Sequence, residues 1–365
     1  MLDFSPTEEQ EEICRLARSV ALEQLRPQGR TAEKKEDISP ALMKTLVKTG
    51  LTTPFPESLG GSGALEAVTY ALIAEELGFG DTGLALNILG SMLGPLAVAL
   101  CGNKAQQEQY IRPFCAEQEG YKARGSLAFA EPTGGYRLAD LQATVRKDGE
   151  KLVINGSKRN VIHGGACRPG VALLRLEGSV GSKGLCAVIV PEQAEGLHIL
   201  IDMHKLGLLA APSVTYTFEN MVVAEAALLG EPGNPGVVRI AALYNILRAG
   251  VACGTARAAL EYASAYAKER MAFGRPIVSY QGIAFILAEM AMKLDAARLL
   301  LWQAATDWDS KVESESLVRS AEAAQRQALY MAQLATTDSL QVMGGAGFMQ
   351  DHPVEMWMRN IAAME

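Results

Sequence analysis

Hydrophobic residues recur at helical spacing at both ends of the chain and alternate with polar residues in its middle. Near the N-terminus Ile13, Leu16 and Val20 fall on one face of an otherwise charged pattern. Around Ser126 the period changes from 3.6 to 2, and helical patterns return near Val237. Helices, then strands, then helices predict an α+β protein and not an alternating, doubly wound sheet.

The 365 residues are too many for one small core, so several domains are expected. The periodicity predicts an N-terminal all-helical domain (1–124), a middle antiparallel β-barrel or sandwich domain (125–232) and a C-terminal four-helix-bundle domain (233–365). In the last of these we expect three long helices, over 237–272, 279–309 and 314–343.

The β-like runs of the middle domain are each bounded by Gly, Pro or Asn. Asp148-Gly149 separates the first two runs and has the composition of a hairpin turn. The strands are expected over 142–146, 151–154, 171–176, 185–190, 198–201 and 213–218.

The segment Thr82–Asn103 carries no charge and has the length of a membrane span. It also contains Gly94-Pro95, which would break a spanning helix. Two buried interior helices are therefore favoured over membrane insertion.

Composition narrows the function classes. The chain is 49% hydrophobic with a formal net charge of −7, which disfavours general binding to nucleic acids or anionic membranes. Its six cysteines and four histidines are scattered, so we expect no disulfide framework, no metal site and a reducing, cytoplasmic location. No strand–GxGxxG–helix unit is present, which argues against a Rossmann cofactor site.

The most informative stretch is Glu269–Ile277 (ERMAFGRPI), followed by Gln281. Arg270 and Phe273 are expected on the last turn of a helix, where a spacing of three puts them on one face. A guanidinium suits phosphate oxygens, and a flat apolar ring suits a base or ribose. A solvated Arg beside a core Phe is the ordinary alternative.

This stretch resembles the acyl-CoA dehydrogenase signature E-R-x-x-F-G-x-P-I followed by Gln. Four further strings resemble that family's motifs in the same order. They are PESLGG at 56–61, EPTGG at 131–135, NGSK at 155–158 and QVMGGAG at 341–347.

The resemblance implies an FAD-dependent enzyme that dehydrogenates an acyl-CoA thioester, by removal of the α proton and transfer of the β hydride to FAD. It also implies a tetramer, made either of this chain or with a homologous subunit, and an electron-transfer flavoprotein as redox partner. In the family, the Arg and Phe of the signature reach the pyrophosphate and adenine side of a neighbouring subunit's FAD.

The resemblance also assigns candidate residues. Substrate contacts are expected from Tyr136, Tyr244 and Asn245. FAD contacts are expected from Arg270, Phe273, Ile277, Tyr280, Gln281, Gln341, Val342, Gly345, Phe129, Ala130, Gly135, Tyr136, Asn160 and Ile162.

Several of these positions depart from the family pattern. Ala130 replaces a Thr, Tyr136 a Ser, and Asn160 and Ile162 replace a Trp and a Thr near the flavin ring. The family's usual Arg falls on Asn245, and the neighbouring Tyr244 is no carboxylate base. These changes support an alternative function: a non-catalytic or half-catalytic subunit that contributes to a partner's FAD site.

The family's commoner catalytic base is a Glu nine residues beyond the Arg that matches Arg359. The candidate here is Glu365, which is only six residues beyond it. A frayed terminal Glu is the ordinary alternative for this residue.

Overall fold

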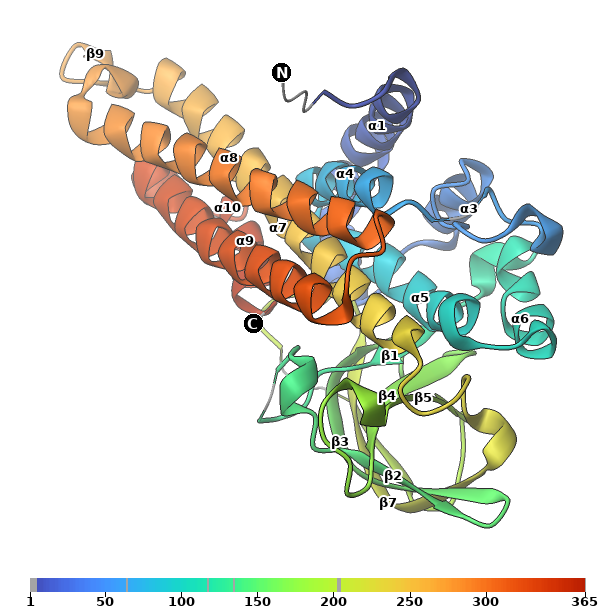
Figure 1. Ribbon diagram of the computed structural model, residues 1–365. Helices are drawn as coiled ribbons and strands as arrows, with labels where there is room; N and C mark the ends of the chain where they lie inside the picture. The colour runs from blue at the N-terminus through green and yellow to red at the C-terminus, as the bar shows by residue number, and fades with distance from the viewer. Residues whose placement is uncertain (1–4, 64, 117, 134, 202–204, 365) are drawn as a thin grey trace.

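The computed structural model describes residues 5–63, 65–116, 118–133, 135–201 and 205–364. N-terminal helices, a β domain and a long helical bundle follow one another, as the α+β prediction required. The bundle extends away from the β domain and ends in a short hairpin near the label β9 (Figure 1). The N-terminal helices are α1 (Glu8–Val20), α2 (Arg26–Lys35), α3 (Pro40–Lys48), α4 (Ala67–Gly80), α5 (Thr82–Cys101) and α6 (Lys104–Tyr110).

Helix α5 runs without interruption through Pro95, so the prediction of two helices was wrong. Proline has no N–H to donate to the carbonyl of Ser91, one turn earlier. The backbone N–H of Gly125 donates to that carbonyl instead, at 2.9 Å. The lost helical bond is thereby replaced from another segment.

Two helices, α5 and α7 (Pro235–Glu269), are long and apolar enough to cross a membrane. In each, most of the apolar window is buried inside the fold, 89% in α5 and 94% in α7. Core helices of a folded domain meet the same length and composition criteria, and these two helices are buried as core helices are.

The middle domain contains a seven-stranded sheet with the order β1-β4-β2-β3-β7-β6 and β5 beside β4. The β2–β3 hairpin turns at Gly149, whose φ of 63° suits glycine. β4 pairs in parallel with both β1 and β2, so the sheet is mixed and not purely antiparallel. The strands are β1 (Ser126–Ala128), β2 (Thr144–Asp148), β3 (Lys151–Ile162), β4 (Gly170–Leu176), β5 (Leu185–Val190), β6 (Leu197–Ile201) and β7 (Ser213–Ala224).

Strand β4 separates two hydrophobic cores. Val171 and Leu173 point into the main core shared with the helices. Ala172 and Leu174 point into the core of the β domain itself. This alternation follows the two-residue period of a strand, and it fixes the sheet against the helices.

The C-terminal bundle contains α7, α8 (Gln281–Asp309) and α9 (Ser314–Met343), with α10 (Val354–Ala362) after them. α7 ends at Glu269 and is followed by a hairpin of β8 (Met271–Ala272) and β9 (Arg275–Pro276). The helix predicted over 237–272 is therefore too long. Phe273 has φ 49° in the hairpin turn and shares no helical face with Arg270.

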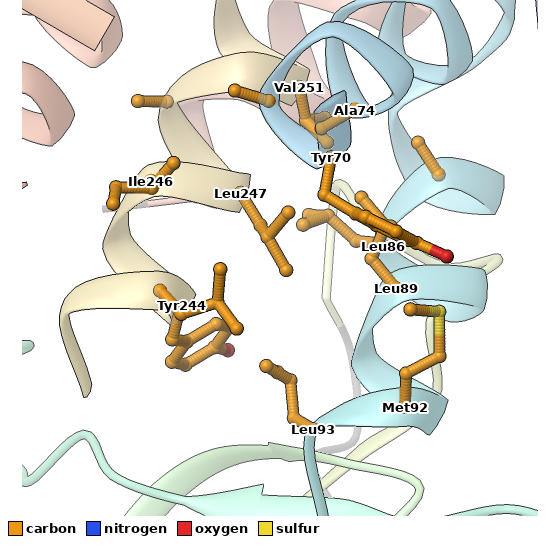
Figure 2. Close-up of a cluster of buried hydrophobic side chains, with 14 of the residues drawn as sticks. Tyr70, Ala74, Leu86, Leu89, Met92, Leu93, Tyr244, Ile246, Leu247 and Val251 are labelled. Carbon is orange, nitrogen blue, oxygen red and sulfur yellow. The ribbon is translucent and has the colours of Figure 1, made fainter. Parts of the chain in front are cut away.

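Helices α4 and α7 cross at close range. A Cβ atom on Gly254 would lie 1.9 Å from the carbonyl oxygen of Glu75, so only glycine fits there. Figure 2 shows the apolar side chains of α4, α5 and α7 meeting beside this crossing, with Tyr244 at one end of the cluster. Tyr244 thus packs in the main core where α7 approaches the β domain.

Candidate active site

A small cavity lies where α5, α7, β3 and the residues after α10 meet; we call it the inner cavity. Its volume is about 40 Å³. The lining residues used below are Tyr136, Asn160, Ile162, Lys205, Tyr244 and Arg248. Four candidates from the sequence, Tyr136, Asn160, Ile162 and Tyr244, are thus brought together.

An aromatic cluster forms one wall of the inner cavity. The ring centroid of Tyr136 lies 5.5 Å from that of Tyr244 and 6.0 Å from that of Phe129. The Asn245 amide donates to the Tyr136 carbonyl at 3.2 Å. Burial raises the pKa of the Tyr244 hydroxyl well above its ordinary value, so it remains a neutral phenol.

Arg248 is the cavity residue that sequence analysis missed. Its guanidinium lies 3.5 Å from the centroid of the Tyr136 ring and donates to the Met364 carbonyl. The side chain is only 2% exposed. A possible signal was present, because Arg248 is the one charge in the apolar run from Ile240 to Thr255.

A buried ion pair anchors the segment that carries Tyr136. The Lys158 ammonium lies 2.6 Å from the Glu131 carboxylate, and neither side chain is more than 3% exposed. The same carboxylate accepts backbone N–H groups from Gln142 and Ala143 at 2.6 and 3.0 Å. Burial lowers the pKa of Lys158 to about 8. These contacts close residues 131–143 into a loop over the inner cavity.

Three further candidates lie around this loop. Phe129 and Ala130 are buried, and the Ala130 carbonyl accepts the Arg159 N–H at 2.9 Å. Gly135 pairs with Glu131 through two backbone hydrogen bonds and has φ 57°. The segment is therefore held by its own backbone contacts.

The other candidates lie on two segments that we call the bundle end: the stretch from the C-cap of α7 through the hairpin β8–β9 to the first turn of α8, and the last turn of α9 with the turn that follows it. Phe273 is 98% exposed, and Arg270, Gln281, Gln341 and Gly345 are exposed as well.

The remaining candidates of the bundle end are more enclosed. The Tyr280 hydroxyl donates to the Ala272 carbonyl at 2.9 Å. The Ile277 N–H donates to the Arg270 carbonyl at 2.9 Å, which closes the hairpin. Val342 is 4% exposed and packs in the main core, so its side chain is turned away from the surface.

The bundle end and the inner cavity are far apart in one chain. Tyr244 and Glu269 are 25 residues apart on α7, which corresponds to about 38 Å at 1.5 Å per residue. Figure 1 shows the hairpin at the end of the bundle remote from the β domain. The two groups of candidates therefore do not form one compact site within a single chain.

The fold has three parts, with a small cavity beside the β domain and a separate set of exposed Arg, Phe and Gln side chains that suit a nucleotide, and this organisation is that of a multidomain cofactor-binding protein. Models of the acyl-CoA dehydrogenase N-terminal, middle and C-terminal domains match residues 7–118, 126–221 and 235–365. The chain belongs to the acyl-CoA dehydrogenase family, whose members dehydrogenate acyl-CoA with FAD.

Individual relatives agree with this assignment. The chain is 34% identical over 360 residues to an acyl-CoA dehydrogenase of Bacillus subtilis, covering 97% of this chain and 92% of the relative. It is 32% identical to the mitochondrial short-chain specific acyl-CoA dehydrogenase of Bos taurus, covering 95% and 84%. The solved butyryl-CoA dehydrogenase of Megasphaera elsdenii matches with a TM-score of 0.85 at 28% identity, covering 100% and 95%.

The bundle end has room for the nucleotide half of FAD, whereas the inner cavity has no room for the flavin ring. At the bundle end a Cβ on Gly345 would meet no atom within 4 Å, so a ligand can approach the backbone at that residue. The inner cavity, at about 40 Å³, is much smaller than the roughly 150 Å³ that accommodates a single benzene ring in a protein interior. It does not admit a flavin ring while Tyr136 occupies its present position.

No described residue lining the inner cavity is an Asp or a Glu. Glu365, the candidate base, lies outside the described residues. Proton abstraction consequently has no assigned base in the described part of the chain.

Proposed function

We propose that this chain dehydrogenates the α,β bond of an acyl-CoA thioester as one subunit of a tetramer, with its bundle end contacting FAD in a neighbouring subunit. One observation carries the oligomeric part: Arg270 and Phe273 are exposed about 38 Å along α7 from the inner cavity. Residues that reach a cofactor in another chain must be exposed in the single chain.

Under this proposal the bundle end recognises the nucleotide half of FAD. Arg270 donates to the pyrophosphate, and Phe273 covers an apolar face of the nucleotide. Gln281 and Gln341 supply amide donors and acceptors. Backbone N–H groups at Gly345 approach closely because no Cβ intervenes. Ile277, Tyr280 and Val342 hold the hairpin and helix end in place, two of them through the contacts described above.

The inner cavity would receive the flavin ring side and the thioester. Bound FAD supplies the acceptor for the β hydride. Tyr136 and Tyr244 line the space for substrate, Asn245 holds the Tyr136 carbonyl beside it, and Phe129, Ala130, Gly135, Asn160 and Ile162 shape the ring side. For this space to open, the Tyr136 ring must move off Arg248. Glu365 is the proposed α-proton base.

Three finer assignments belong to the same proposal. The boundaries 1–124, 125–232 and 233–365 describe the domains. An electron-transfer flavoprotein takes up the electrons, and the protein acts in the cytoplasm. The scattered cysteines, which point to a reducing compartment, support the last of these.

Flavin spectroscopy tests the proposal. The purified full chain should carry FAD absorbance near one FAD per chain. Anaerobic addition of butyryl-CoA should then bleach that absorbance, whereas free CoA and butyrate should not. Protein that binds FAD but is bleached by no acyl-CoA in a chain-length series would contradict the enzymatic proposal.

One observation favours a second candidate, a subunit that completes a partner's FAD site without catalysing the reaction itself. The inner cavity is too small for a flavin ring, and its described lining offers no carboxylate. The family comparisons favour the first candidate. Coexpression with a homologous subunit separates the two, because the second candidate gives one FAD per two chains in the mixed complex and none on this chain alone.

A further inference from the structure

Arg248 is a buried cation facing the inner cavity. It is 2% exposed, and its Nη1 has no hydrogen-bond partner. Within the described ranges no Asp or Glu forms an ion pair with it. Its Nη2 donates to the neutral carbonyl of Met364.

The surroundings of this guanidinium compensate its charge only in part. The Tyr136 ring lies 3.5 Å and the Tyr244 ring 5.8 Å from it, which are cation–π contacts. A buried charge needs a partner of opposite charge to offset its lost hydration. A carboxylate can accept two parallel N–H groups from one guanidinium and is the strongest common partner for it.

The rest of the cavity wall carries one further cation, whose donors are already used, and neutral polar groups. Lys205 is a second cation on the lining, and its Nζ donates to the carbonyls of Leu208 and Ala211 at 3.1 and 2.8 Å. Asn160 and Ser213 add neutral polar groups. No described lining residue is acidic, Lys205 donates to its own segment and to Ser213, and the unpartnered Nη1 of Arg248 is therefore the group that favours an anion.

We infer that Arg248 binds a carboxylate at the far end of the acyl group, so the substrate class is an acyl-CoA with a free terminal carboxylate. This inference rests on the proposed function, because it places the acyl group in the inner cavity. The cavity, about 40 Å³ in volume, accommodates no whole acyl chain. Entry of the acyl group therefore displaces the half-exposed Tyr136 ring and uncovers the Arg248 guanidinium. The substrate carboxylate then takes the place of the ring on that guanidinium.

Matched pairs of thioesters test the inference by isothermal titration of the full chain as purified. Succinyl-CoA is compared with butyryl-CoA, glutaryl-CoA with pentanoyl-CoA, and adipyl-CoA with hexanoyl-CoA. Each pair has equal chain length, and one member carries the carboxylate. At one or more lengths the carboxylate form should bind at least about tenfold more tightly, as expected for a charge-assisted, two-point contact.

Variants assign the preference to Arg248. R248M removes the charge and should reduce the preference to less than about twofold. R248K keeps the charge without the fork and should retain part of the preference. The matched control is R319M, which removes an arginine that is 70% exposed on α9 and should leave the preference unchanged. Melting temperatures show whether each variant is folded.

The inference is overturned if wild-type protein binds both members of every pair equally, or binds no carboxylate form. It is also overturned if folded R248M keeps the full preference. Flavin bleaching is scored separately in the same samples. Tighter binding of the carboxylate form without loss of flavin absorbance would contradict the dehydrogenase proposal but support the carboxylate subsite. Loss of flavin absorbance with butyryl-CoA, without a preference for the carboxylate form, would support the dehydrogenase proposal and contradict the subsite.

Discussion

The bundle end and the inner cavity carry different motifs of one family in opposite physical settings. At the bundle end the candidate side chains project into solvent, and Phe273 is 98% exposed. Around the inner cavity Tyr244, Asn245 and Arg248 are each no more than 5% exposed. A large aromatic ring left in water gives up the stabilisation that burial would supply, which suits a residue proposed to contact a ligand or a neighbouring subunit.

The difference separates stability from binding. The exposed side chains at the bundle end contribute little to the fold, so they are free to contact a ligand or a neighbouring subunit. Side chains around the inner cavity hold helices, sheet and loop together, so their chemistry is tied to the folding free energy. Substitutions should consequently change binding alone at one region and stability at the other.

The largest effect is expected at the ion pair below the inner cavity. Glu131→Ala leaves the buried Lys158 ammonium without its partner and removes the acceptor for two backbone N–H groups. We expect a loss of about 3–5 kcal/mol in the free energy of unfolding. Urea denaturation monitored by circular dichroism measures it.

The matched control is Lys147→Ala, which breaks an ion pair in the same domain. Lys147 and Glu225 are 60% and 41% exposed, so the expected loss is below about 1 kcal/mol. Equal losses in the two variants would show that burial does not distinguish these pairs.

Burial of an ionisable group should also make stability depend on pH at Asp81, which caps α5 by accepting the Leu84 N–H at 2.9 Å. Burial raises the pKa of Asp81 to about 6 from 3.8. Because the folded state holds the proton more tightly than the unfolded state, stability from this group is present below pH 4 and is lost as the pH rises through 6.

Asp81→Asn keeps the capping oxygen but cannot ionise. Relative to wild type, the variant should gain about 2–3 kcal/mol in unfolding free energy between pH 4 and pH 7. Chemical denaturation at both pH values measures the change. A difference between the two proteins that stays constant with pH would rule out ionisation of this buried carboxyl.

At the bundle end, Arg270→Ala should reduce FAD affinity by roughly 10- to 100-fold, the loss of one charge-assisted contact to phosphate. Arg270 is exposed, so the melting temperature should remain within about 1 °C in the absence of FAD. Lys268→Ala removes a neighbouring exposed cation and should change affinity less than about threefold. Affinity is measured by fluorescence titration of the deflavinated protein, and full affinity in Arg270→Ala would remove the bundle end from the FAD site.

Sequence periodicity predicted the order of helices and strands well, because amphipathic spacing is a local property. It failed where a distant segment decides the outcome. Pro95 does not end its helix because the Gly125 N–H takes up the carbonyl of Ser91. The hairpin after Glu269 was missed since Met271 and Ala272 continue an acceptable helical composition.

The site shows the same division. The motif strings identified residues at both regions, but spacing in sequence cannot show that about 38 Å of helix separates them. Arg248 was missed because its meaning depends on what surrounds it. A single arginine in an apolar helix becomes informative only when its neighbours prove to be two tyrosines and a carbonyl.

The smallest expected effect concerns the loop that closes the inner cavity. Tyr136→Ser removes the ring that lies on Arg248, while the Glu131–Lys158 pair still anchors the loop. If the Tyr136 ring on Arg248 competes with FAD entry, removing the ring raises the fraction of molecules whose inner cavity is open. The apparent rate and affinity of FAD uptake then rise in proportion. We expect a gain of roughly three- to tenfold in the rate at which deflavinated protein takes up FAD, followed by stopped-flow fluorescence.

Tyr330→Ser, at a tyrosine 57% exposed on α9, is the control and should leave the rate unchanged. An equal rate in Tyr136→Ser and wild type would mean that the ring does not limit entry, and the inner cavity would then have to open by movement of a whole segment.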